Sequence, residues 1–449
     1  MSVPKQELII QEIEKSTKVF NGVFFKGIPL TPLINLNLYW YLIGHKKTGI
    51  SLRKDTDSVE FIETINNLTD QYFLLKKSSF KKTQSLARND FKQWLKGFFK
   101  KNYLRDIKPD YLIHIESIKY YRYIYQYALD LKSKGNKVAF LIFENDRIEE
   151  SEGFIYIYMK NIKRPFPVFW NKHYGSFQKI LLDIQKLENI YKSLGFPKSL
   201  VVEGDVPAQI IAGYLSKKYN FESICYQWGY TGTSVYKIGW RNMPYSLFIS
   251  WGEFFSESYK KENPSLIMKE LGHPLALKNN HSGQKTEDRN YILFAVSKEM
   301  NPFINFGDII KFITVAINFG DNNSSLYKIR LRTHPNFIPN KEVQELLDSS
   351  NIEVHNYYEH SLEKSFQNVK YCISVSSTVS LESIAFGCFP LYFKVNDIPL
   401  LLHEELKAIL KYDFIIDYDE DINKKIVRID NEVRDIQIDY NKIFKQQCY

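Results

Sequence analysis

The chain has 449 residues, and its 60 Lys and Arg residues outnumber 51 Asp and Glu residues to give a net charge of +9. A composition of 44% hydrophobic and 25% charged residues is typical of globular proteins and excludes disordered and collagen-like chains. The length predicts two or three domains. The moderate positive charge favours an anionic partner such as a nucleotide, a phosphate or a lipid surface, and no nucleic-acid-binding motif is present.

The features that bear on cellular location favour the cytoplasm. The four cysteines are scattered without a C-x-x-C pair, which predicts free thiols in a reducing compartment and neither a zinc site nor a disulfide framework. The N-terminus lacks the basic and apolar regions of a signal peptide, and no run of about 18 apolar residues occurs. We therefore expect a cytoplasmic protein, either soluble or peripheral at the inner face of the cytoplasmic membrane.

The first 109 residues are predicted to form a mostly helical extension packed on the domain that follows. Within it, residues 89–101 place aromatic side chains among the lysines Lys92, Lys96, Lys100 and Lys101. On a helix this pattern gives an aromatic face with a basic border, which is typical of an element at a membrane surface. The alternative is an ordinary helix that faces the core and has a solvated basic side.

From residue 110 onward, short apolar runs alternate with helical patterns. The first series has predicted strands at 111–115, 137–143, 199–202, 223–227 and 247–250, and helices at 117–133, 207–219 and from 253. The second series has strands at 291–296, 327–332, 352–354, 371–374 and 389–393, and helices at 303–319, 341–348, 362–367 and 378–386. Such alternation predicts parallel sheets covered by helices.

A polar stretch at 278–289 separates the two series and predicts a linker. The expected fold is therefore α/β, with two Rossmann-like αβα domains at 110–277 and 290–395 that face a central cleft. Residues 396–449 are predicted to form C-terminal helices and a tail. Because ligands of such sheets bind at the carboxyl ends of the strands, the residues that follow the strands are the candidates for a site.

The first candidate is Glu203-Gly204-Asp205, directly after the strand at 199–202. Gly204 allows a tight turn or the close approach of a ligand, and either carboxylate can act as a general base or nucleophile at a sugar. The alternative is that Asp205 caps the helix that starts at Pro207. The sequence predicts a catalytic role for Asp205 or Glu203, with a slight preference for Asp205.

The second candidate is the segment that closes the strand at 327–332. Alternation places Arg330 and Arg332 on one face, and an arginine can bind a phosphate through two hydrogen bonds. His334 follows at the strand end, where it can donate to the same phosphate or act as an acid. Another His-Pro pair, at His273, is expected to form only a turn.

The third candidate is the hydroxyl-rich start of a helix, at Ser376, Ser377 and Thr378. Hydroxyl and backbone N–H groups at a helix N-terminus bind anions, so this segment predicts phosphate binding, with capping alone as the alternative. Glu382, one turn into the helix, is predicted to reach a ribose or sugar hydroxyl.

A fourth segment contains Gln227, Trp228 and Tyr230 among glycines. Aromatic rings pack on sugar faces and amides bind hydroxyls, which favours contact with a saccharide acceptor. The alternative is a glycine-rich connection with a buried Trp.

Several catalytic signatures are absent from the sequence. It has no P-loop, dinucleotide fingerprint, nucleophile elbow or zincin motif. Among its D-x-D triplets, Asp417-Tyr418-Asp419 lies in a late acidic stretch and not at a predicted strand end. We therefore expect neither a metal nor another cofactor.

The order of these motifs resembles that of bacterial GT-B glycosyltransferases that use CMP-activated sugars, over about residues 110–395. This group includes sialyltransferases, polysialyltransferases and the Kdo transferases of capsule and O-antigen synthesis. The carboxylate-Gly-carboxylate turn, the His-Pro after a basic strand and the hydroxyl-rich helix start carry the resemblance. The segment 227–274 is also similar to GT-B enzymes that build surface polysaccharides.

The resemblance implies that domain 110–277 binds the acceptor and domain 290–395 the nucleotide sugar. The implied activity is metal-independent transfer of a Kdo-like or sialic-acid-like 2-keto sugar from CMP. The acceptor would be an oligosaccharide or lipid-linked glycan in capsule or lipopolysaccharide synthesis. Asp205 or Glu203 would be the catalytic carboxylate, and His334 and residues 376–378 would hold the CMP phosphate. The donor carboxylate would meet Arg330, Arg332 or Arg241.

Three alternatives remain open at the level of sequence. One is a GT-B transferase that uses a UDP-, GDP- or TDP-sugar. Another is a non-catalytic glycan-binding protein of polysaccharide assembly. The third is a sugar-nucleotide epimerase with a similar two-domain build, which would act without an acceptor.

Overall fold

The structure is a computed structural model of the chain. It describes residues 5–44, 58–76, 103–143, 148, 150–162, 174–202, 204, 206–229, 234–274, 289–297, 304–323, 327–334, 337, 339–357, 359–375, 377–395, 410–417 and 420–433. The proposed membrane-surface element at 89–101 lies outside these ranges. Within them, no helix combines the length and the apolar character needed to cross a membrane.

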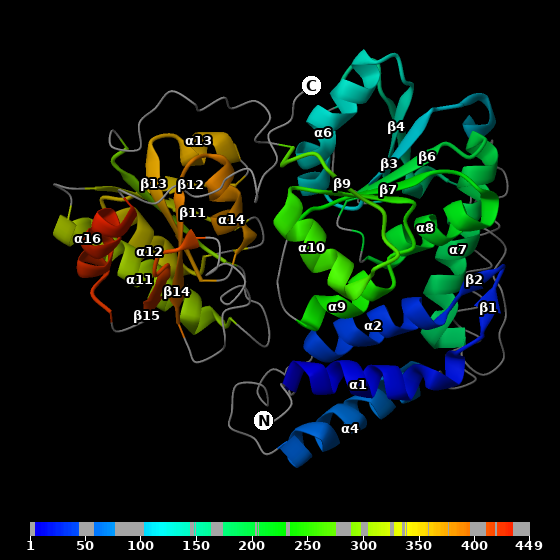
Figure 1. Cartoon of the computed structure of the whole chain (residues 1–449), viewed down its shortest axis with the longest axis horizontal. Helices are drawn as coiled ribbons and strands as arrows, with labels where there is room; N and C mark the ends of the chain where they lie inside the picture. Colours follow the sequence, from blue (N-terminus) through cyan, green and yellow to red (C-terminus); the bar gives the residue numbers. More distant parts are fainter. Residues whose placement is uncertain are drawn as a thin grey trace.

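The described residues of the N-terminal part form three α-helices and a short hairpin. The helices are α1 (Lys5–Thr17), α2 (Thr31–Gly44) and α4 (Ser58–Lys76), and the hairpin joins β1 (Phe24–Phe25) to β2 (Ile28–Pro29) after the turn η1 (Lys18–Phe20). α1 buries Ile9, Ile10 and Ile13, whose spacing places them on one helical face. α2 contacts α8 and α4 contacts α7, so this part packs on the helices of the first sheet (Figure 1).

The first sheet has seven strands, all parallel, in the order β5-β4-β3-β6-β7-β8-β9. The strands are β3 (Tyr111–Ile115), β4 (Val138–Ile142), β5 (Ile155–Tyr158), β6 (Lys198–Val202), β7 (Ser223–Tyr226), β8 (Leu247–Ser250) and β9 (Met268–Glu270). The helices are η2 (Tyr103–Asp106), α6 (Ile118–Ser133), η3 (Met159–Asn161), α7 (Tyr174–Leu194), α8 (Pro207–Tyr219), α9 (Ser234–Arg241) and α10 (Glu253–Glu262).

The second sheet has six strands, also parallel, in the order β12-β11-β10-β13-β14-β15. The strands are β10 (Tyr291–Ala295), β11 (Lys328–Arg332), β12 (Glu353–His355), β13 (Val369–Ser374), β14 (Phe389–Lys394) and β15 (Ile415–Asp417). The helices are α11 (Phe306–Asn323), α12 (Lys341–Ser349), α13 (Leu362–Phe366), α14 (Thr378–Ala385) and α16 (Ile422–Val433).

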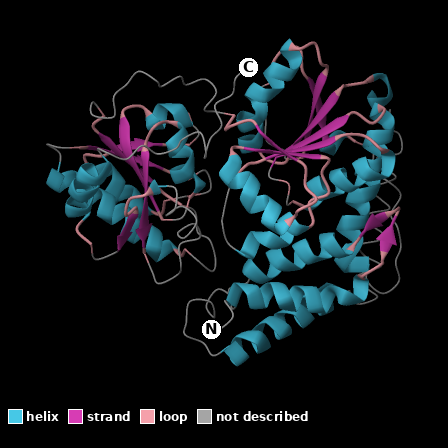
Figure 2. Ribbon diagram, viewed as in Figure 1, coloured by secondary structure: helices cyan, strands magenta, loops and turns pink. Residues whose placement is uncertain are grey.

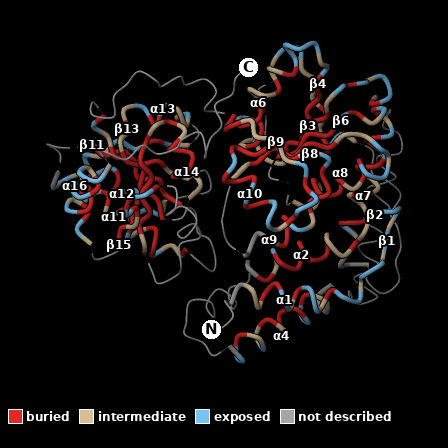
Figure 3. Tube along the Cα trace, in the orientation of Figure 1, coloured by how far each residue is buried: buried red, intermediate tan, exposed pale blue. Residues whose placement is uncertain are grey.

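Both sheets are doubly wound, which explains their nearly continuous apolar strands. Every residue of β4 is buried, as Figure 3 shows for the centre of each sheet, because helices cover both faces (Figure 2). In each sheet the first strand of the series, β3 or β10, lies inside the sheet and the strand order reverses beside it. Ligands of such sheets bind at the carboxyl ends of the strands near this reversal. The predicted α/β fold with two Rossmann-like domains is therefore confirmed.

The C-terminal region differs from the expectation of helices and a tail alone. β15 pairs in parallel with β14, so the second sheet continues beyond residue 395. Asp417 is the last residue of β15. The expectation that no D-x-D triplet stands at a strand end is therefore wrong, because β15 was not predicted from the sequence.

The end of the predicted linker belongs to the second domain. Arg289 is buried, and its Nη1 donates to the carbonyls of Phe386 and Gly387 at 3.0 and 2.7 Å. These bonds satisfy carbonyls at the C-terminus of α14, where backbone acceptors lack helical partners. The rest of the linker, 278–288, lies outside the described residues.

Candidate active site between the two sheets

Two contacts bring the strand ends of the first sheet against helix α14 of the second. His273, which follows β9, has its Nε2 atom 3.3 Å from Oε1 of Glu382. Gly229, which follows β7, faces Thr378, because a Cβ atom built on this glycine would lie 3.4 Å from Thr378 Cγ2. The carboxyl ends of the two sheets therefore meet at the N-terminal half of α14.

Aromatic rings enclose His273 on the side of the first domain. Its ring centroid lies 4.7 Å from that of Trp251 and 5.3 Å from that of Tyr123, and only 1% of the residue is exposed. Glu382 is 8% exposed. A buried carboxylate needs a hydrogen-bonding partner, and His273 is that partner for Glu382.

Tyr123, on α6, joins the loops that follow β7 and β8. Trp251 Nε1 donates to the Tyr123 hydroxyl at 2.6 Å, and this hydroxyl donates in turn to the carbonyl of Gln227. Burial is the main cause that raises the pKa of Tyr123 well above its usual value. The phenol is therefore neutral at every physiological pH and acts as a fixed hydrogen-bonding link.

The predicted acceptor residues have separate positions in this arrangement. Gln227 is fully buried, and its Oε1 accepts from the backbone N–H of Trp251 at 3.0 Å, which indicates a structural role. Trp228 is half-buried, and its ring centroid lies 4.8 Å from that of Tyr123, with Lys119 Nζ 5.2 Å from the Trp228 ring. Tyr230 lies outside the described residues. Trp228 is thus the residue of this set best placed to contact a ligand.

The predicted phosphate segment forms the N-terminus of α14. Ser377 is the N-cap, and its Oγ accepts from the N–H of Val379 at 3.3 Å. Below it, Ser380 donates to Ser374 Oγ at 2.6 Å, which fixes the start of the helix to the end of β13. Ser377 therefore caps the helix, which was the alternative to phosphate binding for this segment. Thr378 faces the first domain instead, and Ser376 lies outside the described residues.

The carboxylates Glu203 and Asp205 lie outside the described residues, but Gly204 between them is described. It has φ +87°, its N–H donates to Gln209 Oε1 at 2.7 Å, and its carbonyl accepts from the Tyr245 hydroxyl at 2.8 Å. A Cβ atom at this position would lie 2.5 Å from Cys225 Sγ. Only glycine fits this fixed turn. The N-cap position of α8 is occupied by Val206 and not by Asp205.

The two predicted phosphate-binding arginines are both buried, but they have different surroundings. Arg330 donates through Nη1 to the carbonyls of Ser365 and Gln367, both at 2.9 Å, and through Nη2 to Glu353 at 2.9 Å. These contacts indicate a structural role for Arg330. Arg332 contacts α13 and the ring of Tyr357, closer to the first domain.

His334 lies at the end of β11 and lines a pocket of about 220 Å³. The pocket lies between this strand end, β12 and α12, and its polar lining includes Thr333, Gln344, Asp348 and Asn356. In the order of the sheet, β10 separates β11 from β13, the strand that leads to Ser377. The structure thus places His334 with α12 and β12, whereas Thr378 and Glu382 face the first domain.

Sequence reasoning missed two members of the site, His273 and Tyr123. His273 was interpreted as part of a turn because the three-residue strand β9 before it was not predicted. Within the described residues, no group of three or more His, Cys, Asp or Glu side chains is placed to hold a metal ion. Independence from metals stays a prediction.

No protein-family model matches the sequence, and no curated protein is similar to it. Solved structures are similar in fold. A protein from Listeria monocytogenes described as a candidate UDP-N-acetylglucosamine 2-epimerase has a TM-score of 0.52 and 10% identity, over 76% of this chain and 94% of that one.

Two further structures have TM-scores below 0.5. UDP-GlcNAc 2-epimerase from Neisseria meningitidis has a TM-score of 0.47 and 14% identity, over 75% of this chain and 94% of that one. MurG from Acinetobacter baumannii has a TM-score of 0.44 and 11% identity, over 75% and 94%. The two sheets and the first similarity together define a GT-B fold.

Proposed function

We propose that the chain is a glycosyltransferase that moves a sugar from a nucleotide donor to a saccharide acceptor. The observation that carries this proposal is the meeting of the two sheets at α14, where Glu382 contacts His273. Donor groups at the start of α14 would then face acceptor groups held by the loops after β7, β8 and β9. Transfer between two substrates requires such a shared boundary, because the reacting atoms must lie about 3–3.5 Å apart.

The positions of Thr378, Glu382 and Trp228 support their proposed roles. The order of the motifs along the chain supports the roles proposed for the other residues, His334 included. Thr378 and the backbone at the start of α14 would bind the donor phosphate, with Ser376 and Ser377 beside them, and Glu382 would accept from a ribose or sugar hydroxyl. Asp205 or Glu203 would take the proton of the acceptor hydroxyl as its oxygen attacks the anomeric carbon. The bond from that carbon to the phosphate oxygen breaks, and His334 would bind and protonate the leaving phosphate. Trp228 would pack on the acceptor.

The donor we propose first is a CMP-linked 2-keto sugar acid. The reason is that the order of the motifs along the chain resembles that of enzymes that use CMP-activated sugars. A UDP-sugar is the second candidate, since the Listeria protein with the similar fold is described as acting on UDP-N-acetylglucosamine. That same description supports an epimerase as a further candidate. A glycan-binding protein without catalysis would keep Trp228 but would tolerate loss of the carboxylates. A lipid-linked acceptor and contact with the inner membrane surface belong to the same proposal.

A panel of CMP-, UDP-, GDP- and TDP-sugars, each with and without oligosaccharide acceptors, tests the proposal. We expect a glycosylated acceptor with one class of donor, and a loss of about 10²–10⁴-fold in kcat for Asp205→Asn or Glu203→Gln. His334→Ala should weaken both turnover and nucleotide binding. Sugar conversion without any acceptor would identify an epimerase. Absence of turnover with every donor, combined with glycan binding that survives both carboxylate substitutions, would identify a binding protein.

A further inference from the structure

Two arginines from different domains contact the same aromatic ring. Tyr357, which follows β12, has its ring centroid 5.6 Å from the guanidinium carbon of Arg122 on α6 and 5.5 Å from that of Arg332 on β11. Arg122 is exposed and Arg332 is 5% exposed. Two positive charges from different domains thus contact one ring at the boundary, and the charge of Glu382 also acts on Arg332.

Hydrogen bonds hold Arg332 from the side of the second domain. Its Nη1 donates to the carbonyls of His360 and Ser361 at 3.0 and 3.3 Å, and to Ser365 Oγ at 2.5 Å. Within the described part of the chain, the hydrogen bonds of Arg332 all leave from Nη1. The other edge of its guanidinium group is therefore available to an anion, which arginine binds through two parallel hydrogen bonds.

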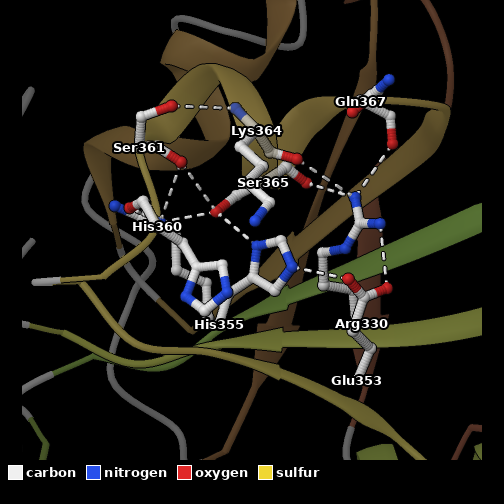
Figure 4. Close-up of polar contacts among 9 residues, drawn as sticks. Arg330, Glu353, His355, His360, Ser361, Lys364, Ser365 and Gln367 are labelled. Carbon is white, nitrogen blue, oxygen red and sulfur yellow. Dashed lines mark hydrogen bonds and ion pairs between the residues drawn. The ribbon is translucent and has the colours of Figure 1, made fainter.

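Ser365 is in turn fixed by a buried histidine. His355 Nδ1 lies 2.9 Å from Ser365 Oγ, and His355 Nε2 lies 2.6 Å from Glu353 Oε1 (Figure 4). The ring of His360 stacks on that of His355 with centroids 4.2 Å apart. Burial is the main cause that lowers the pKa of His355, so the ring is neutral at pH 7. This network orients Arg332 toward Tyr357.

Arg122 has no carboxylate that neutralises it within the described residues; its contact there is the ring of Tyr357. The two arginines also affect each other. Burial, the largest cause, lowers the pKa of Arg332, and the positive charge of Arg122 lowers it further, whereas Tyr357 and Glu382 raise it. Like charges near one another repel, and an anion that reaches both arginines reduces that repulsion.

We propose that Arg122 and Arg332 form an anion-binding site that spans the two domains and takes a phosphate or carboxylate group of the sugar substrate. The inference rests on the proposed function, and it adds a residue of the first domain, Arg122, to the binding of the donor or acceptor.

The test measures thermal shifts of the full chain with pyrophosphate and, separately, with glucuronate, at an ionic strength held constant with chloride. A ligand that binds the native state raises the melting temperature, and a titration gives its apparent Kd. We expect one of the two anions to stabilise the wild type, and Arg122→Gln to bind it about tenfold more weakly, because a hydrogen bond to a charged group is lost. Lys132→Gln, on the same helix but bonded to the carbonyl of Glu152, is the control for net charge.

Each outcome separates the possibilities. A shift with pyrophosphate alone assigns the site to a phosphate, and a shift with glucuronate alone assigns it to a sugar carboxylate. No shift with either anion, or an equal shift in wild type and Arg122→Gln, would overturn the site. Arg332→Lys, which keeps the charge, should show an intermediate loss. Anion binding at this site can be confirmed even if no donor supports transfer. A failure of the proposed function and a failure of the anion-binding site therefore give different results.

Discussion

His273 packs against aromatic rings on one side and a carboxylate on the other. The sequence predicted only a turn here, because the strand before it, Met268–Glu270, is short and lacks an apolar pattern. Its partners Tyr123 and Glu382 come from segments far away in the chain. Local patterns cannot reveal such a site, since the tertiary fold alone brings these residues together.

Replacement of Glu382 by glutamine tests its proposed contact with a ribose. The amide can still bond to His273 but removes the charge that strengthens a hydrogen bond from a hydroxyl. We expect the Kd of the preferred nucleotide to rise about tenfold, as measured by calorimetry. The loss should be smaller with the 2′-deoxynucleotide. Glu342→Gln, in the exposed first turn of α12, is the control, and an equal effect of both substitutions would contradict the assignment.

Gly204→Ala should destabilise the fold more than a substitution at another glycine of the same conformation. The new methyl group would meet Cys225 Sγ at 2.5 Å, and the residue would keep φ +87°. Gly135 has φ +84° with nothing within 4 Å of an added Cβ atom, so it isolates the backbone cost. We expect unfolding free energies lower by about 1 kcal/mol for Gly135→Ala and by about 3 kcal/mol for Gly204→Ala in urea titrations. Similar losses would show that the turn relaxes.

At the scale of elements, the sequence predicted the strands and helices that have clear patterns. α8 begins at Pro207 and ends at Tyr219, as expected, because Pro207 marks its start and Asn220 adopts the left-handed conformation at its end. Four strands and α-helices of the first domain were missed, β5, α7, α9 and β9. β5 follows a turn at Gly153 and has only four residues, of which one, Ile157, is buried. α7 does have a helical apolar pattern, with Ile180, Ile184, Leu187 and Tyr191 buried on one face, and this pattern was overlooked.

Glu188, on α7, joins the N-terminal part to the first domain. Its carboxylate lies 2.6 Å from both Lys26 Nζ, in the hairpin, and Lys218 Nζ, on α8, and its side chain is 2% exposed. Burial raises the pKa of Glu188, but the bonds from Lys218, Lys26 and Tyr219 outweigh it and lower the pKa to about 2. A carboxyl group whose pKa is lowered by folding stabilises the fold at pH values above its pKa in the unfolded chain. This stabilisation is lost as the pH falls toward its pKa in the folded state.

Glu188→Gln should therefore lower the free energy of unfolding by about 3 kcal/mol at pH 7. The difference in unfolding free energy between wild type and Glu188→Gln should shrink below pH 4.5. At pH 3.5 it should be about 1 kcal/mol smaller than at pH 7. Urea titrations at the two pH values measure it. Glu222→Gln removes an exposed pair with Lys198 and should cost under about 1 kcal/mol. A difference that stays constant with pH would show that packing, and not charge, stabilises this junction.

At the scale of the whole molecule, alternating patterns sufficed to predict two parallel sheets. They did not predict that β15 extends the second sheet, because its pairing with β14 depends on a segment beyond the regular alternation. The patterns also did not distinguish the roles of the two arginines of β11. Both alternate onto one face, yet Arg330 bonds to carbonyls around α13, whereas Arg332 reaches Tyr357. Burial and partners, which are set by the assembled sheet, decide between a structural and a binding role.

The basic and aromatic segment 89–101 makes a prediction about membrane surfaces. We expect weak sedimentation with anionic liposomes at low salt, since each lysine near such a surface contributes about 1 kcal/mol and salt screens it. Charge reversal of Lys92, Lys96, Lys100 and Lys101 should abolish it. The control reverses four lysines elsewhere on the surface, Lys15, Lys134, Lys341 and Lys424. Equal sedimentation of both variants would reject the role of this segment.

Metal-independent turnover is the last prediction, and the position of Asp417 gives it a direct control. Cationic groups of the chain, Arg122, Arg332 and the N-terminus of α14, would balance the charge of the donor phosphate, so no ion is required for that purpose. However, Asp417 ends β15 and forms a D-x-D triplet, a pattern that can hold a metal with a diphosphate. Asp417 Oδ1 lies 3.5 Å from Lys394 Nζ, and this cation competes with a metal for the carboxylate.

We therefore expect initial transfer rates in EDTA to stay within about twofold of those with Mg²⁺ or Mn²⁺, because the chain's own cations supply the stabilisation. Asp417→Asn should leave the rate unchanged under both conditions. Loss of activity in EDTA with recovery on adding Mg²⁺ would contradict the prediction. If Asp417→Asn then abolished the recovered activity as well, the metal would belong to the end of β15, and a nucleoside diphosphate donor would replace CMP as the proposed substrate.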